Sequence, residues 1–286
     1  MRRQLAIATL IIFSGAVSQI AGAYRPTVIY GDDDRLDYYQ VTDVAWQAKA
    51  DSTVALIRSS SLDTQGPVTN IKSVHYGQSM GLCVSEPYYE QETAAFCSGF
   101  LLSPDTIVTA GHCIRSQESC ASTKFVIGFR LEAAGVQPRQ VASDQVYSCA
   151  TLVHSVASPT GEDFAVVKLD RAVTQVQPLA FRQSGALALD DALTVIGHPT
   201  GLPLKVAGGA TVRTMGAEFL VANLDTYGGN SGSAVFNTVT GEVEGVLVRG
   251  ETDFVYKDGC RKSNKCADSG CRGEDVTLIE RVRPYL

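Results

Sequence analysis

Long apolar runs are nearly absent from this 286-residue chain. The longest extends from Leu5 to Phe13, follows two arginines and precedes a small-residue ending, Ala21-Gly22-Ala23. It is well short of the roughly 18 residues that a membrane span needs, so the layout indicates a cleaved signal peptide over residues 1–23 rather than a membrane anchor. No later segment is apolar enough to cross a bilayer. We therefore expect a secreted protein, extracellular or periplasmic, without a membrane partner.

Basic charge is also in short supply. The chain has 24 Lys and Arg against 30 Asp and Glu, and the signal peptide carries two of the arginines and no acid. The mature net charge is therefore about −8, which disfavours a nucleic-acid or anionic-membrane partner.

The cysteines lack the CxxC pairing that is typical of structural zinc sites. They are Cys83, Cys97, Cys113, Cys120, Cys149, Cys260, Cys266 and Cys271. An even number in an exported chain favours disulfides. The alternative is zinc bound by the last three cysteines, with spacings of six and five residues, but we expect no metal and no cofactor.

Long helical periodicity is scarce as well, and short strand-like runs divided by Gly, Pro, Asn and Asp fill the chain from Asp51 to Val282. Ten runs have the length and the β-branched or aromatic content of strands. They are STVALIRSS, GFLLS, TIVTA, KFVIGFR, FAVVKL, LTVIG, ATVRTM, EFLVANL, SAVFN and EVEGVLVRG. This pattern predicts an all-β barrel or sandwich protein and argues against βαβ units.

Two helical exceptions stand out: a polar segment after His112, and the tail from Asp275, where Val276, Ile279 and Val282 recur at helical spacing behind an Asp cap. Two halves meet near residues 173–185, and no low-complexity linker separates them. The polar, cysteine-containing stretch 252–275 is expected to be a surface excursion.

The stretch GGNSGSAVF raises the question whether Ser231 is a nucleophile or only a polar residue in a glycine turn. Activating a serine hydroxyl requires a base, and histidine suits this role because its pKa lies near neutrality. Of the four histidines, His112 follows the strand TIVTA and adjoins Cys113. The others, His75, His154 and His198, are interpreted as structural.

A carboxylate should orient that imidazole. Asp163 stands at the mouth of the apolar strand FAVVKL, where its side chain can enter a buried cleft. Glu162 is its nearest rival. Asp170, at the other end of the strand and followed by Arg171, is expected to form a surface ion pair.

Three segments, CSGFLLSPDTIVTAGHC, EDFAVVKL and DTYGGNSGSAVF, resemble in this order the His, Asp and Ser segments of chymotrypsin-fold serine proteases. GNSGS, VIYGDDDR and VIGHPTGLPLK are similar to the bacterial branch of staphylococcal V8 protease and other glutamyl endopeptidases. The resemblance implies two packed antiparallel six-stranded β-barrels with a C-terminal helix. It places the first barrel in residues 28–178 and the second in residues 179–286.

The resemblance also implies a Ser-His-Asp triad of Ser231, His112 and Asp163 that acts through an acyl-enzyme. The oxyanion hole would be formed by the backbone N–H groups of Gly229 and Ser231. A disulfide is implied between Cys97 and Cys113. The expected partners are protein or peptide substrates, acted on by a monomer.

Substrate selection is implied for six residues, Asp225, Thr226, Leu247, Val248, Arg249 and Gly250. Asp225 would bind Arg or Lys side chains, or else serve as a turn carboxylate. Thr226 matches the glutamyl endopeptidases, but Leu247 stands where those enzymes use histidine. Val248 replaces a serine that supports the catalytic aspartate, and Arg249 would favour acidic groups near the scissile bond or face water.

Asn230 stands where animal enzymes have the aspartate that pairs with the new amino terminus. The resemblance suggests Val28 as the mature terminus, with removal of residues 24–27 as the activating step. Amino-terminal sequencing of the active protein tests this: an active form beginning at Tyr24 would count against it.

Two other functions are weighed against a protease. A non-catalytic homologue acting as a binding module is disfavoured because no triad member is missing. A lipase or esterase is disfavoured because the GxSxG elbow needs glycine where Ser233 stands.

Overall fold

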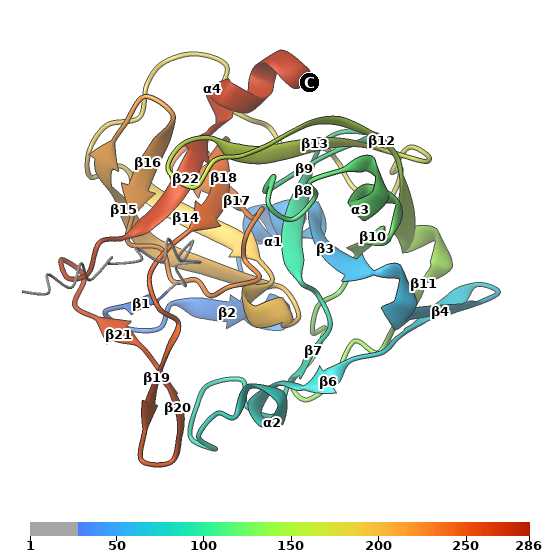
Figure 1. Ribbon diagram of the computed structural model, residues 1–286, viewed down its shortest axis with the longest axis horizontal. Coiled ribbons are helices and arrows are strands. Elements are labelled where there is room, and N and C mark those ends of the chain that lie inside the picture. The colour runs from blue at the N-terminus through green and yellow to red at the C-terminus, as the bar shows by residue number, and fades with distance from the viewer. Residues whose placement is uncertain (1–27) are drawn as a thin grey trace, which may run out of the picture.

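The computed structural model describes residues 28–286, in which two groups of strands lie side by side (Figure 1). The expected signal peptide and the segment 24–27 lie outside the described residues. Within the described range, none of the helices has the length and apolar character needed to cross a membrane.

Six antiparallel strands close the first barrel, and each pairs with the next until the last returns to the first. In ring order they are β3 (Thr53–Arg58), β8 (Cys97–Ser103), β9 (Thr106–Thr109), β13 (Asp163–Leu169), β12 (Val146–Ala157) and β10 (Thr123–Ile127). Strand β13 is apolar on both faces because Ala165 and Val167 fill the barrel while Phe164 and Val166 face the second barrel.

Six more strands close the second barrel through the pairing of β14 with β15. In ring order they are β14 (Ala192–Gly197), β17 (Ala234–Asn237), β18 (Val243–Arg249), β22 (Glu274–Leu278), β16 (Phe219–Ala222) and β15 (Lys205–Met215). Strand β2 (Arg35–Asp37) adds to β15 from outside the ring. The prediction of two six-stranded antiparallel barrels is confirmed.

A shared apolar core joins the barrels, with members such as Phe100 and Phe164 from the first and Phe236 and Val248 from the second. Helix α1 (Val44–Asp51) closes one side of it, where the Trp46 ring meets the edge of Phe236 at 5.6 Å between centroids. Burying side chains of both barrels in one core fixes the orientation of the two halves.

The C-terminal helix is present but shorter than its sequence pattern predicts. Asp275 and Val276 belong to strand β22, and helix α4 covers only Ile279–Val282, followed by a 3-10 turn at Arg283–Tyr285. The predicted helix start at Asp275 is wrong because β22 pairs with β16 and β18 on its two sides, and these pairings override the helical spacing.

The remaining elements decorate the barrels. Among the strands are β1 (Ile29–Tyr30), β21 (Lys265–Cys266), β4 (Leu62–Gln65), β5 (Val68–Ile71), β11 (Gln140–Ala142), β6 (Val74–His75), β7 (Glu92–Thr93), β19 (Phe254–Lys257) and β20 (Cys260–Ser263). Short helices are α2 (Tyr76–Met80) and α3 (Gln117–Ala121), and 3-10 turns lie at Tyr38–Gln40, Ser59–Ser61, Ser143–Gln145 and Pro199–Gly201. The β19–β20 hairpin projects from the molecule beside α2 (Figure 1).

All eight cysteines form disulfides: Cys83–Cys260, Cys97–Cys113, Cys120–Cys149 and Cys266–Cys271. The zinc alternative at the last three cysteines is therefore wrong, because disulfide sulfurs are not the thiolates that bind zinc. Most of the stretch 252–275 lies on the surface as expected. Its last three residues are the exception, because Gly273, Glu274 and Asp275 are buried, the last two in β22.

Candidate functional site

His112 and Asp163 lie on neighbouring strands of the first barrel. His112 follows β9, and Asp163 opens β13, which pairs with β9 in an antiparallel ladder. One carboxylate oxygen lies 2.8 Å from His112 Nδ1, and the other accepts the backbone N–H of His112 at 3.0 Å. With both oxygens engaged, Asp163 fixes the imidazole ring relative to its own backbone.

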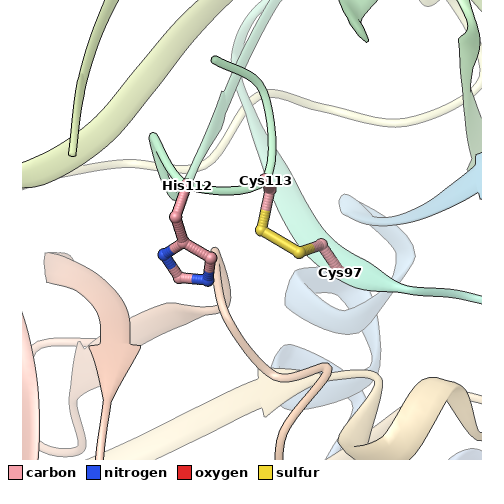
Figure 2. Close-up of side chains that lie close together, drawn as sticks. All are labelled: Cys97, His112 and Cys113. Carbon is pink, nitrogen blue, oxygen red and sulfur yellow. A yellow bond between two sulfur atoms is a disulfide. The ribbon is translucent and has the colours of Figure 1, made fainter. Parts of the chain in front are cut away.

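The Cys97–Cys113 disulfide ties the turn that carries His112 to β8, as Figure 2 shows. Its two sulfurs and a His112 ring nitrogen lie within 4.8 Å of one another, the one such cluster of possible metal ligands in the described part of the chain. Sulfur atoms joined in a disulfide are not thiolates, so this set does not form a zinc site. The bond instead holds the turn beside the imidazole.

Ser231 reaches the same place from the second barrel. The Ser98 N–H donates to the Ser231 carbonyl oxygen at 2.9 Å, and Cys113 Sγ lies 3.8 Å from that oxygen. Gly232 has φ +92°, and a Cβ there would lie 2.1 Å from the Ser98 carbonyl oxygen. Only glycine permits this close approach, which sets Ser231 against the residue next to His112.

Gly229 is constrained in a similar way. Its φ is +97°, and a Cβ would lie 2.8 Å from the backbone nitrogen of Gly201. Ser98 Oγ donates to the Gly229 carbonyl oxygen at 3.0 Å. The turn is therefore held from both barrels, and glycine is required at 229 by both its backbone angle and its surroundings.

Residues of the second barrel hold Asp163 from behind. The Asp163 N–H donates to Thr277 Oγ1 at 3.3 Å, and that hydroxyl lies 3.2 Å from the Asp163 carbonyl oxygen. Val248 is buried in the inter-barrel core. Thr277 thus supports the backbone of Asp163. The sequence did not predict this contact, because the two residues are 114 positions apart.

The side chain of Arg249 turns toward Asp163 rather than toward water. Its Nη1 lies 3.7 Å from the carboxylate and donates to the Ser158 carbonyl at 2.6 Å, while Nη2 donates to the Gly161 carbonyl at 2.7 Å. Its Nε bonds to Asp275 at 3.1 Å. Arg249 therefore clamps the loop before Asp163 to the second barrel.

The rival acids and the other histidines have separate partners. Glu162 pairs with Arg281 at 2.5 Å, and Asp170 forms the expected exposed pair with Arg171 at 3.2 Å. His75 contacts Glu90, and His154 stacks on Tyr285. His198 Nδ1 lies 3.0 Å from the Leu202 carbonyl, and burial lowers the pKa of His198 to about 3.

Asp225 faces the amino-terminal segment. Its two oxygens accept the backbone N–H groups of Tyr30 at 2.7 Å and of Asp34 at 2.9 Å. Burial raises the pKa of Asp225 to about 7, although these hydrogen bonds act in the opposite direction. The carboxylate thus holds a turn of the chain, which is the second of the two roles weighed for it.

Thr226 faces Glu274, a residue that sequence reasoning missed. The Thr226 hydroxyl donates to Glu274 Oε2 at 3.2 Å, and Glu274 is completely buried at the start of β22. Leu247 lies in the core of the second barrel, and its backbone bonds to Gly232 and Ser233. The one sequence feature that could have indicated Glu274 is its position at the end of the polar stretch 252–275, just before the apolar residues of β22.

Comparisons with known proteins find peptidases. The family model described as a trypsin-like peptidase domain matches residues 97–246, more than half of the chain. A curated relative is the "Extracellular metalloprotease" of Bacillus subtilis (strain 168), 25% identical over 245 residues, which cover 76% of this chain and 71% of that protein.

Two solved structures are among the matches. The Vibrio cholerae VesB protease is 16% identical with a TM-score of 0.53, and the match covers 88% of this chain and 66% of that one. A Glu endopeptidase in complex with MPD is 20% identical with a TM-score of 0.48, covering 83% of this chain and 94% of that one.

Proposed function

The chain belongs to the family of trypsin-like peptidases and is a serine endopeptidase; we propose that Ser231 is its nucleophile, His112 its general base and Asp163 the acid that orients the base. The observation that carries this assignment is the double contact of Asp163 with His112, at 2.8 Å to Nδ1 and 3.0 Å to the backbone N–H. Ser231 supports it because its carbonyl lies against Cys113, the next residue after His112.

The reaction follows from these positions. Asp163 holds Nδ1, so Nε2 of His112 takes the proton as Ser231 Oγ attacks the peptide carbonyl carbon. The N–H groups of Gly229 and Ser231 would stabilise the oxyanion, each worth roughly 10²–10³ in rate. His112 then returns the proton to the leaving amine, and water hydrolyses the acyl-enzyme by the same steps.

We further propose that the enzyme is secreted and cleaves protein or peptide substrates as a monomer. The amino-terminal residues 1–23 have the layout of a signal peptide, and the Bacillus subtilis relative is named as extracellular. The four disulfides are typical of proteins that function in an oxidising compartment.

Replacing Ser231 by Ala tests the assignment. We expect peptidase activity to fall roughly 10⁶-fold and covalent labelling by a fluorophosphonate to disappear, because no other group replaces the nucleophile. Ser269→Ala, at an exposed serine, is the matched control and should retain both. Undiminished activity in Ser231→Ala would overturn the assignment, and absence of labelling in the wild type would favour a non-catalytic homologue.

A further inference from the structure

Carboxylates gather on one side of the serine loop. Glu274 receives a hydrogen bond from Thr226, and Asp253 Oδ2 accepts the Gly228 N–H at 3.1 Å. The Glu251 N–H donates to Glu274 Oε1 at 3.3 Å. Two carboxylates, those of Glu274 and Asp253, thus contact residues 226–228, only a few positions before Ser231, and their combined field favours a cationic partner.

Among residues 28–286, no cation forms an ion pair with Glu274. Its recorded partners in the described chain are three neutral donors: the Thr226 hydroxyl, the Tyr30 hydroxyl at 3.4 Å and the Glu251 N–H. Arg213 is the nearby cation, but it lies over the Tyr30 ring, 4.6 Å from its centroid. A buried carboxylate without a counter-ion is costly, and such groups are usually paired.

The carboxylate also lies where a substrate side chain would arrive. A Cβ on Gly250 would be 1.6 Å from Glu274 Oε2. The Glu274 carboxylate therefore lies directly against the backbone of Gly250, the residue that follows β18. Thr226 contacts the same oxygen from the serine loop. Glu274 thus lies between Thr226 and Gly250, two residues for which the resemblance implies substrate binding.

Asp225, the acid that the resemblance assigns to this role, is occupied. Both its oxygens accept backbone N–H groups of the amino-terminal segment, at 2.7 and 2.9 Å. A substrate cation would have to compete with two fixed backbone donors there. At Glu274 it would compete with two hydroxyls, which can rotate away, and one long backbone contact.

We propose that Glu274 determines specificity by pairing with the lysine or arginine side chain that precedes the scissile bond. This inference rests on the proposed function, because it needs Ser231 as the nucleophile. Glu274 is fully enclosed in the substrate-free molecule, so the incoming side chain must part the walls and displace the Tyr30 hydroxyl, its longest contact.

Binding should then be linked to pH. Burial, together with the like charge of Asp253, raises the pKa of Glu274 well above its ordinary value, and the hydrogen bonds from Glu251, Thr226 and Tyr30 oppose this only in part. A substrate cation favours the ionised carboxylate, so one proton passes from Glu274 to solvent as the ion pair forms. The KM for a lysine or arginine substrate should therefore fall as pH rises.

Peptides that differ only in Lys, Arg, Glu, Phe or Ala before the scissile bond provide the test. We expect the wild type to prefer Lys and Arg, and Glu274→Gln to lose roughly 30- to 10³-fold in kcat/KM on these two, mainly through KM. Cleavage of the Ala and Phe peptides should change less than about threefold, since they make no ion pair. Retained Lys and Arg preference in Glu274→Gln would overturn the proposal.

Two further measurements keep its failure separate from that of the proposed function. Fluorophosphonate labelling of Glu274→Gln reports whether Ser231 and His112 are intact, and we expect it to match the wild type. In the wild type itself, KM for the Lys peptide should fall with pH while KM for the Ala peptide does not. Parallel profiles, or loss of Lys preference in Asp225→Asn but not in Glu274→Gln, would refute Glu274 as the selecting residue.

Discussion

Glu274 and Asp275 are consecutive acids on β22, and they face opposite environments. Side chains alternate along a strand, so the two carboxylates point to opposite faces of the same ribbon. Asp275 is paired with two arginines, Arg249 at 3.1 Å and Arg272 at 2.5 Å. The described partners of Glu274 are neutral donors: the hydroxyls of Tyr30 and Thr226 and the Glu251 N–H.

This difference separates a structural carboxylate from one available to a ligand. On the Asp275 face, Arg249 connects Asp275, Asp163 and the carbonyls of Ser158 and Gly161, so charges are balanced within the chain. On the Glu274 face, the part of the chain that the structure describes supplies no balancing charge. A buried carboxylate without a paired cation is destabilising, and a cationic ligand can supply the missing charge. We therefore assign a structural role to Asp275 and a binding role to Glu274.

Among the variants compared here, the largest effect should come from removing the carboxylate of Asp163, which Arg249 links to Asp275. We expect Asp163→Asn to lower kcat about 10⁴-fold, because the amide cannot hold His112 in the required tautomer. Asp170→Asn, at the other end of β13, is the matched control and should change kcat less than twofold, since its ion pair with Arg171 is exposed. Steady-state kinetics with a circular dichroism check of folding measures both, and similar kcat values for the two would contradict the role of Asp163.

A smaller loss is expected when the clamp is removed but the triad is kept. Arg249→Gln should lower kcat roughly 10- to 100-fold, because the loop before Asp163 loses its link to the second barrel and the carboxylate shifts. Steady-state kinetics with a circular dichroism check of folding measures the change in kcat.

Arg272→Gln is the control for that variant. It removes the other partner of Asp275, and Arg272 contacts neither Asp163 nor the loop before it, so kcat should stay close to that of the wild type. Arg249→Lys keeps the charge without the fork of donors, so it should restore kcat only in part. Equal effects of Arg249→Gln and Arg272→Gln would show that Arg249 acts only through stability.

The sequence predicted the barrels and the positions of His112, Asp163 and Ser231 better than the surroundings of Asp225 and Glu274. His112, Asp163 and Ser231 stand at strand ends or in glycine turns within short local motifs, and the ten predicted runs all correspond to barrel strands. Strand β12 was missed because bulges between Cys149 and Thr151 and between Leu152 and His154 break its alternation. The helical spacing of Val276, Ile279 and Val282 wrongly predicts a helix start at β22, because the strands that pair with β22 come from distant parts of the chain.

The roles of Arg249, Asp225 and Glu274 could not be predicted because each depends on contacts between distant segments. Glu274 meets Tyr30 across 244 residues, and Asp225 meets Tyr30 across 195. No local pattern states that the amino-terminal segment supplies the two N–H groups that occupy Asp225. Asp225 has two short backbone hydrogen bonds and Glu274 has only longer contacts, and this difference arises only in the folded chain.

Asp225 is an intermediate case between the two faces, since it lacks a cation but has two backbone donors, and its stability effect should be the smallest. Its pKa of about 7 in the folded protein exceeds the ordinary value of 3.8. Between about pH 4 and pH 7 the folded state therefore holds the extra proton, and the Asp225 contribution makes the protein less stable as pH rises through this window.

In Asp225→Asn that pH-dependent contribution is absent, although one backbone N–H loses its acceptor at a cost of about 1–3 kcal/mol. The variant should melt below the wild type at pH 4, by about 2–4 °C for each kcal/mol, and the gap should narrow toward pH 7. Thermal unfolding of both proteins at several pH values measures how the gap in melting temperature changes with pH. The pH-dependent contribution of Glu274 is present in both proteins, so it cancels in this gap. A gap that stays constant or widens would mean that Asp225 is ionised throughout, and that its two backbone donors balance its charge as fully as the arginines balance Asp275.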